Sequence, residues 1–302
     1  MLVSFPTEIR KSVINTIIQA RFAGHLAADG SVGHHGDNRD VSICFNTEET
    51  EFVAPTIDSM HASFGIHNET QSNANGTLLV KRSSKHLLSD FARKIVVGKG
   101  EKKKFTSEVT LLDPELQLHV LGAYIQSDGT YNEQNDVFEI TTYSKDLANQ
   151  LLLMFYRCGI LARVNKQPIS SSNKTFKTKN EFRYIVNVPS SECGKISEYV
   201  PGKSKTLRLR NKGSNWRFFW KNFVVSRVTS NKSFQYEGNV YDVRLPPTFT
   251  VTANGISVHQ CRFYYDNEPK VAAAIDFYGN FSMSGFKLEC KSKEILKYFE
   301  QV

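Results

Sequence analysis

Two aspartates, Asp29 and Asp128, each end a run of mostly small and apolar residues, and each is followed by a glycine. The two runs read FAGHLAADG (22–30) and LGAYIQSDG (121–129), so the aspartates lie 99 residues apart. Small residues in such runs allow two helices to approach closely. Two carboxylates at the end of a packed helix pair supply the oxygen ligands that a hard divalent cation prefers. The spacing therefore predicts a metal site built from two distant parts of the chain.

Similar elements follow each aspartate. A strand is predicted at 41–45 and again at 137–141, because both segments are rich in β-branched and aromatic residues. Each strand leads into a helix whose apolar residues recur at steps of three and four. These helices are expected to end at Gly65 and Gly159, where glycine suits the residue just beyond a helix.

The parallel continues with a strand at 77–81 and a helix that carries Leu87, Leu88, Phe91 and Ile95. In the second copy, a strand at 183–188 leads to a weaker helix. We therefore expect an α+β fold with pseudo-twofold duplication. It would consist of two αββαββα halves, about residues 10–105 and 106–210.

Composition and charge narrow the class of protein. The chain has 302 residues, of which 40% are hydrophobic, with a net charge of +8, which suits a polyanionic partner. Many basic proteins bind no nucleic acid, so the charge alone does not decide. We expect no membrane partner, because no apolar run reaches membrane-spanning length. The five cysteines form no CxxC pair, which fits the reducing cytosol of the host cell.

The duplicated pattern resembles the LAGLIDADG homing endonucleases, in their single-chain form with two motifs. The resemblance covers about two thirds of the chain and implies a monomeric enzyme that cuts double-stranded DNA at a specific site. The eighth motif position holds the metal-binding acid in that family. By position, Asp29 and Asp128 would bind Mg²⁺, and Lys103 of the EKKKF segment would assist catalysis. Lys203 and Lys205 are the weaker counterparts of Lys103 in the second half. A solvated charge run is an alternative interpretation of the EKKKF segment.

The sequence departs from the family at the sixth motif position, where an acid is common. Ala27 and Gln126 occupy that position here. This leaves a second hypothesis open, in which the chain is a catalytically decayed DNA-binding protein or an RNA-intron maturase. A third hypothesis is a structural protein with accidental motifs, which would have no affinity for DNA.

A second signature lies at residues 240–261, VYDVRLPPTFTVTANGISVHQC, where an Asn254-Gly255 hairpin turn is expected. The segment resembles the last two sequence blocks of inteins, which belong to the β-rich Hint type. The resemblance implies a splicing role for four residues. Cys261 would be the nucleophile, and Gln260 would cyclise and cleave its own peptide bond. His259 would polarise that bond, and Asp242 matches an acid that often coordinates the nucleophiles.

No N-terminal intein block precedes the first aspartate motif, and residue 1 is Met. The resemblance therefore implies the C-terminal fragment of a split intein, which would splice in trans with a separate N-terminal fragment. The expected domains are an endonuclease at 1–210, a splicing segment at 215–260 and a C-extein fragment at 261–302.

Overall fold

The computed structural model describes residues 2–33, 40–67, 71–72, 76, 78–169, 181–203, 217–226, 250–253, 256–259, 274–275 and 281–282. The chain divides into two compact units. One comprises Phe5–Asn215, and the other joins Met1–Ser4 to Trp216–Val302. Among the described residues, no helix combines the length and the apolar character needed to cross a membrane.

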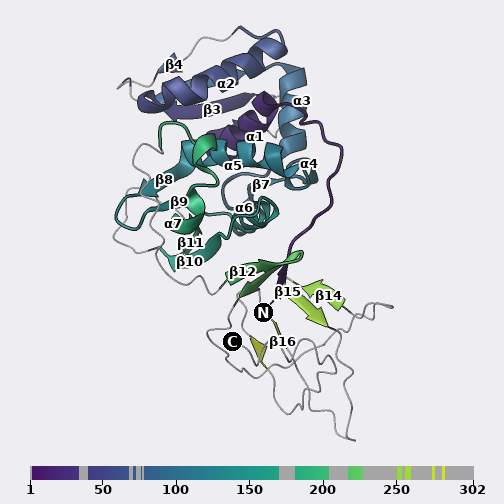
Figure 1. Cartoon of the computed structure of the whole chain (residues 1–302). Coiled ribbons are helices and arrows are strands. Elements are labelled where there is room, and N and C mark those ends of the chain that lie inside the picture. Colours follow the sequence, from purple (N-terminus) through teal and green to yellow (C-terminus); the bar gives the residue numbers. More distant parts are fainter. Residues whose placement is uncertain are drawn as a thin grey trace, which may run out of the picture. The chain divides into compact units, whose positions relative to one another are not determined.

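The first half of the larger unit contains a helix, a four-stranded antiparallel sheet and two further helices (Figure 1). The sheet order is β2-β3-β5-β4. The elements are α1 (Ile17–Asp29), β2 (Gly30–Val32), β3 (Val41–Asn46), η1 (Thr47–Glu49), α2 (Thr50–Ser63), β4 (Gln71–Ser72), β5 (Leu78–Ser83) and α3 (His86–Ile95).

The second half repeats this arrangement with the strand order β8-β9-β11-β10. Its elements are α5 (Pro114–Asp128), β8 (Gly129–Asn132), β9 (Val137–Thr142), α6 (Lys145–Arg157), β10 (Arg163–Pro168), β11 (Phe182–Val188) and α7 (Ser190–Cys193). Each sheet has its second strand packed against all three helices of its own half. The expected duplicated α+β topology is thus confirmed.

Short elements connect and follow the halves. A two-stranded ribbon, β6 (Val96–Val97) and β7 (Lys104–Phe105), flanks η2 (Gly100–Lys102). A short helix, α4 (Ser107–Thr110), then leads to α5, and η3 (Ser197–Tyr199) follows α7.

Local sequence explains why these elements begin and end where they do. In β3, Val41, Ile43 and Phe45 are buried, and the residues between them are not, as expected for a strand with one covered face. Helix α6 begins because the Ser144 hydroxyl accepts a hydrogen bond from the Leu147 amide, at 3.1 Å. The chain leaves this helix at Gly159, whose φ of +70° suits glycine.

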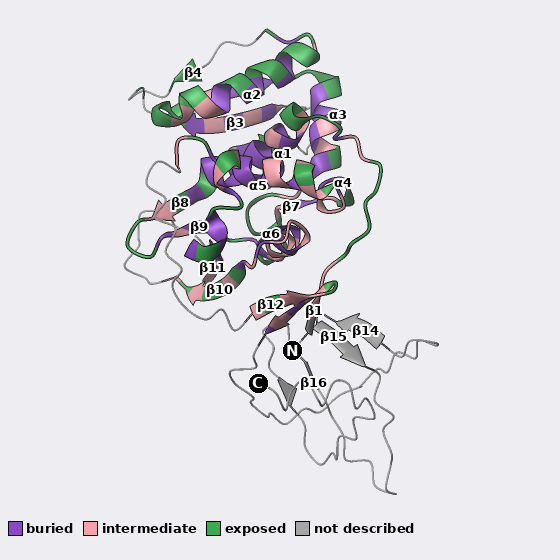
Figure 2. Ribbon diagram, in the orientation of Figure 1, coloured by how far each residue is buried: buried purple, intermediate pink, exposed green. Residues whose placement is uncertain are grey.

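Helices α1 and α5 pack along each other at the centre of the unit, and most of their residues are buried (Figure 2). Gly24 makes this approach possible. A Cβ atom there would collide with the Val120 carbonyl and would come within 2.8 Å of the Ala123 Cβ. The apolar core extends through both halves, so the two halves fold around one shared helix pair.

The smaller unit contains a five-stranded sheet with the order β12-β13-β1-β15-β14. Its strands are β1 (Leu2–Ser4), β12 (Arg217–Trp220), β13 (Phe223–Ser226), β14 (Thr250–Ala253) and β15 (Ile256–His259), and β16 (Ala274–Ile275) pairs separately with β17 (Phe281–Ser282). Strands β14 and β15 are antiparallel, with Ala253 opposite Ile256, as a hairpin at the expected position requires. Strand β1 pairs with β13 and β15, so the first residues of the chain complete this sheet.

Candidate metal and nucleic-acid site

Asp29 and Asp128 are the last residues of α1 and α5. Each helix ends in the same way, because the following glycine takes an extended conformation and begins a strand. The amide of Gly30 donates to the Leu26 carbonyl, and that of Gly129 donates to the Ile125 carbonyl. A Cβ atom at Gly129 would lie 2.5 Å from the Ile125 carbonyl oxygen, so a side chain would disturb this turn.

The two carboxyl groups lie together and share a side-chain hydrogen bond. Burial, followed by the charges of Asp128 and Glu49, raises the pKa of Asp29 to about 7. Burial also raises the pKa of Asp128, although that residue is exposed along part of its side chain. Nearby Lys103 and Lys203 act in the opposite direction on both pKa values. The pair therefore gathers negative charge that a cation would stabilise.

Lys103 lies at the end of the first motif helix. Its Nζ donates to the carbonyl oxygens of Ala28 and Gly30, at 2.8 and 2.9 Å. These carbonyls belong to the negative end of the α1 dipole, where a cation is favourable. Burial lowers the pKa of Lys103, and the two aspartates oppose that change. The half-buried ammonium group is thus fixed beside the carboxyl pair and is not part of a solvated charge run.

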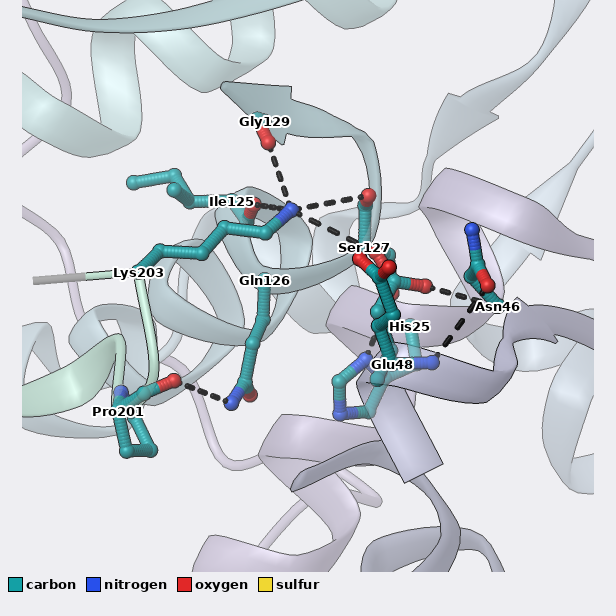
Figure 3. A network of polar contacts seen from close by, with 10 residues as sticks. His25, Asn46, Glu48, Ile125, Gln126, Ser127, Gly129, Pro201 and Lys203 are labelled. Atoms are coloured by element: carbon teal, nitrogen blue, oxygen red, sulfur yellow. Dashed lines mark hydrogen bonds and ion pairs between the residues drawn. The ribbon is translucent and has the colours of Figure 1, made fainter. Parts of the chain in front are cut away.

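Lys203 occupies the equivalent place at the end of α5 (Figure 3). Its Nζ donates to the carbonyls of Ile125, Ser127 and Gly129, at 3.2, 3.3 and 2.7 Å. The sequence indicates Lys203 and Lys205 as weaker counterparts of Lys103. Lys205 is outside the described residues, and Lys203 makes contacts that correspond to those of Lys103. The signal was available, because the lysines are 100 residues apart and the aspartates 99.

Glu49 is a third acid near the pair, and it was not predicted from the sequence. Its Oε1 lies 3.6 Å from the Nζ of Lys203, and its Oε2 accepts a hydrogen bond from the Asn46 amide, at 3.0 Å. Together with the Asn46 side chain, this bond forms a capping box at the start of η1. The spacing Asn-x-x-Glu after a strand was the sequence signal that could have identified it.

The sixth motif positions serve packing. Ala27 is buried between the helices. Gln126 is also buried, and its side-chain amide bridges two parts of the fold. Its Oε1 accepts from the Arg21 guanidinium, and its Nε2 donates to the Pro201 carbonyl at 3.0 Å. Gln126 thereby anchors the segment that carries Lys203.

A buried polar pair lies within the helix interface beside the site. The Nδ1 of His25 lies 2.9 Å from the Ser127 hydroxyl. Complete burial lowers the pKa of His25 to about 3, so this ring is neutral at physiological pH. His25 therefore adds no positive charge beside the aspartates.

The described residues hold no cluster of three or more His, Cys, Asp and Glu side chains suited to a metal. The candidate metal site is therefore the aspartate pair alone. A hollow of about 320 Å³ on the outward face of the first sheet is lined in part by Ser42, Gln71 and Arg82. Its lining includes neither aspartate and neither lysine.

The residues expected to act in splicing lie mostly beyond what the structure describes. Asp242, Gln260 and Cys261 are outside the described residues. His259 is the last residue of β15 and pairs with Thr250 of β14. The splicing roles of these residues stay predictions.

Similarity to known proteins bears on the class of this chain. Residues 115–219 match the family model of the LAGLIDADG-like domain. With the duplicated topology, this match defines the α+β fold as LAGLIDADG-like.

Curated relatives resemble this chain in sequence at low identity. The ATP-dependent DNA helicase Hel308 of Thermococcus kodakarensis is 24% identical over 75% of this chain and 20% of its own length. An A-type ATP synthase component of Pyrococcus abyssi is 27% identical over 50% of this chain and 14% of its own length. The uncharacterized protein MJ1054 of Methanocaldococcus jannaschii is 24% identical over 80% of this chain and 28% of its own length. The chain thus spans less than a third of these relatives.

Solved structures with similar folds include homing endonucleases. I-DmoI in complex with DNA and Mn aligns with 62% of this chain and 97% of its own, at 15% identity and a TM-score of 0.44. I-WcaI bound to its DNA recognition sequence aligns with 66% of this chain and 88% of its own, at 12% identity and a TM-score of 0.39.

Proposed function

We propose that residues 5–215 form a site-specific endonuclease that hydrolyses both strands of double-stranded DNA with a divalent metal. The observation that carries this proposal is the carboxyl pair of Asp29 and Asp128, flanked by two lysines that cap the helices bearing them. Two acids and two cations in matching positions suit a reaction that occurs twice, once on each strand.

The carboxyl pair fits a divalent metal. Its groups sit close enough to share a hydrogen bond, and the raised pKa of Asp29 reflects unfavourable crowding of negative charge. Carboxylate oxygen is the ligand that Mg²⁺ prefers, and Mg²⁺ usually completes its shell with water and substrate phosphate oxygens. A bound metal would activate water and stabilise the leaving oxygen of the phosphodiester. Asp29 and Asp128 would hold it.

The lysines supply fixed positive charge at the same place. A phosphate gains negative charge as water attacks it, and preorganised cations stabilise such charge most effectively where water is largely excluded. Lys103 and Lys203 are held by two and three backbone carbonyls, respectively, and need no rearrangement to act. Each would stabilise the transition state in its own half-site.

The outward faces of the two sheets offer a surface for DNA. In the first sheet, Ser42 of β3 lies opposite Arg82 of β5. In the second sheet, Arg163 and Asn165 of β10 lie opposite Asn187 and Ile185 of β11. Arginine and asparagine side chains can hydrogen-bond base edges in the major groove, and the net charge of +8 favours the phosphate backbone.

A decayed DNA binder or RNA-intron maturase is the alternative. The loss of acids at positions 27 and 126 favours it, but Gln126 has a packing role that accounts for its presence. The retention of both aspartates and both lysines in equivalent geometry favours cleavage.

To test this, a plasmid library of random inserts and of host-gene fragments is incubated with the protein and Mg²⁺. The plasmids that are cut are then selected and sequenced. Linear products with short 3′ overhangs at one recurrent sequence support the proposal. Asp29→Asn should bind that sequence without cutting it. Shifted but uncut DNA with the unmodified protein would favour the binder, and no binding at low salt would exclude both.

We propose a second function, protein splicing, for the smaller unit. Its support is the intein-like run at 240–261 together with the hairpin of β14 and β15 that carries His259 at its end. A helicase and a component of an ATP synthase share only a small part of their length with this chain. An inserted element is expected to recur in proteins whose names differ as much as these.

Splicing chemistry at the C-terminal junction can be tested on the full chain. The side-chain amide nitrogen of Gln260 would attack its own backbone carbonyl and form a six-membered imide. The Gln260–Cys261 peptide bond would break, and the amine of Cys261 would leave with residues 261–302. Mass spectrometry should detect both fragments, and Gln260→Ala should abolish them. An intact chain after prolonged incubation would show that the smaller unit does not cleave by itself, and an intact chain after incubation with an N-terminal intein fragment would contradict the proposal.

A further inference from the structure

The two lysines make matching contacts with the helix ends, but the charges around them differ. Glu49 lies 3.6 Å from the ammonium group of Lys203. Within the part of the chain that the structure describes, Lys103 forms no ion pair with a carboxylate. The pseudo-twofold arrangement is therefore broken at the site by one acid.

The strand register gives the counterpart of Glu49 in the second half. Ile43 pairs with Gly30 and Ile140 pairs with Gly129, so Glu49 corresponds to Asp146. Asp146 lies 3.4 Å from the ammonium group of Lys104, the neighbour of Lys103. Both halves thus place an acid after the second strand, but among the described residues only Glu49 pairs with a lysine that is bonded to the end of a motif helix.

Glu49 is held where it can act on Lys203. One carboxylate oxygen accepts from the Asn46 amide, and the other faces the lysine. The Lys203 and Glu49 side chains are only 25% and 22% exposed, so solvent and salt screen the pair less than a surface pair. The carboxylate keeps Lys203 on the α5 carbonyls, and it also offsets the positive charge that a DNA phosphate would meet.

We propose that Glu49 is a positioning residue that makes the two half-sites unequal, so that the strand cut beside Lys203 is cut more slowly than the strand cut beside Lys103. This inference rests on the proposed endonuclease function. Both cations feel the aspartate pair, but a phosphate beside Lys203 meets a cation that is also paired with Glu49, whereas a phosphate beside Lys103 meets a cation bonded to backbone carbonyls. The chain would therefore pass through a nicked intermediate with one preferred strand.

The test is strand-resolved cleavage of a duplex containing the sequence recovered in the selection, with a different fluorophore on each strand. Glu49→Gln removes the charge but keeps an oxygen that can accept from Asn46. The wild type should nick one strand first. Glu49→Gln should shift the ratio of the two nicking rates toward unity by about 5-fold, the size expected of a partly screened ion pair. Glu48→Gln, an exposed neighbour in the same turn, should leave the ratio unchanged.

A second measurement separates a charge effect from a structural one. In Lys203→Gln, the partner of Glu49 is absent, so adding Glu49→Gln should change the ratio no further. Equal nicking of both strands by the wild type, or an unchanged ratio in Glu49→Gln, would overturn the inference and leave the endonuclease intact. A wild type that cuts neither strand would instead overturn the proposed function, and this inference with it.

Discussion

Gly24 of α1 lies directly against the backbone carbonyl of Val120 in α5, with no side chain between them. This contact sets how closely the two helices approach, and therefore how closely Asp29 and Asp128 approach at the helix ends. The separation of the carboxyl groups is thus decided by a glycine about one and a half turns earlier in the helix.

Gly24→Ala should destabilise the larger unit, because the new methyl group must displace the backbone of α5. Overpacking of this kind costs about 1–3 kcal/mol, which chemical denaturation can measure. Ala62→Leu, which enlarges an exposed residue of α2, serves as the control and should change stability little. Equal stability of Gly24→Ala and wild type would show that the helices can separate freely.

The raised pKa of Asp29 predicts how stability depends on pH without metal. The folded protein binds this proton up to about pH 7, whereas an unfolded chain releases it near the ordinary value of 3.8. The unfolded state therefore binds fewer protons in this range, and the free energy of unfolding should fall as pH rises from about 4 to 7. Thermal unfolding in chelator at several pH values measures this slope.

Asp29→Asn should flatten that slope, and Asp90→Asn, at an exposed residue of α3, should not. With saturating Mn²⁺ the trend should reverse, because the metal binds the deprotonated pair and its affinity rises as the proton leaves. A metal-free slope that is the same in wild type and Asp29→Asn would contradict the coupling of the two carboxyl groups.

The EKKKF segment offers a matched pair of lysines. Lys103→Met should lower the cleavage rate by about 10²-fold, since it removes a preorganised charge beside the reacting phosphate. Lys102→Met removes an exposed charge from the adjacent residue and should leave the rate nearly unchanged. Single-turnover cleavage of the selected duplex at saturating protein measures both. Similar losses in the two variants would mean that the segment acts only through its overall charge.

Arg157 of α6 forms hydrogen bonds with two other parts of the chain, the segment at Glu8 and the segment at 112–117. Its guanidinium donates to the carbonyls of Leu112 and Glu8, at 2.7 and 2.9 Å, and to the side chain of Gln117, at 3.0 Å. Arg157→Ala would leave these acceptors without their donor and should cost about 1–3 kcal/mol. Denaturant titration against Arg163→Ala, an exposed arginine of β10, tests this. Equal midpoints would mean that water replaces the guanidinium without loss.

Much of the larger unit could be predicted from sequence because its signals are local. The alternation in β3 and the Ser144 cap of α6 each depend on residues within one or two turns of each other. The glycine at the end of each motif helix is equally local. Repetition of these signals in the same order then made the duplicated topology predictable.

The missed features depend on contacts between distant residues. Glu49 meets Lys203 only because two halves of the chain fold together, and no periodic pattern reports such an encounter. Gln126 was interpreted as a lost acid because its partners, Arg21 and the Pro201 carbonyl, are remote in sequence. Pairing of β1 with β13 and β15 could not be predicted from a three-residue strand.

The position of β1 has a consequence for biosynthesis. Residues 2–4 leave the ribosome before the rest of this sheet, and their partners in β13 follow more than two hundred residues later. The larger unit can fold during translation, while β1 must wait without its strand partners until β13 and β15 emerge. Closure of that sheet is therefore a late event, and it can occur only on chains whose translation has reached the second unit.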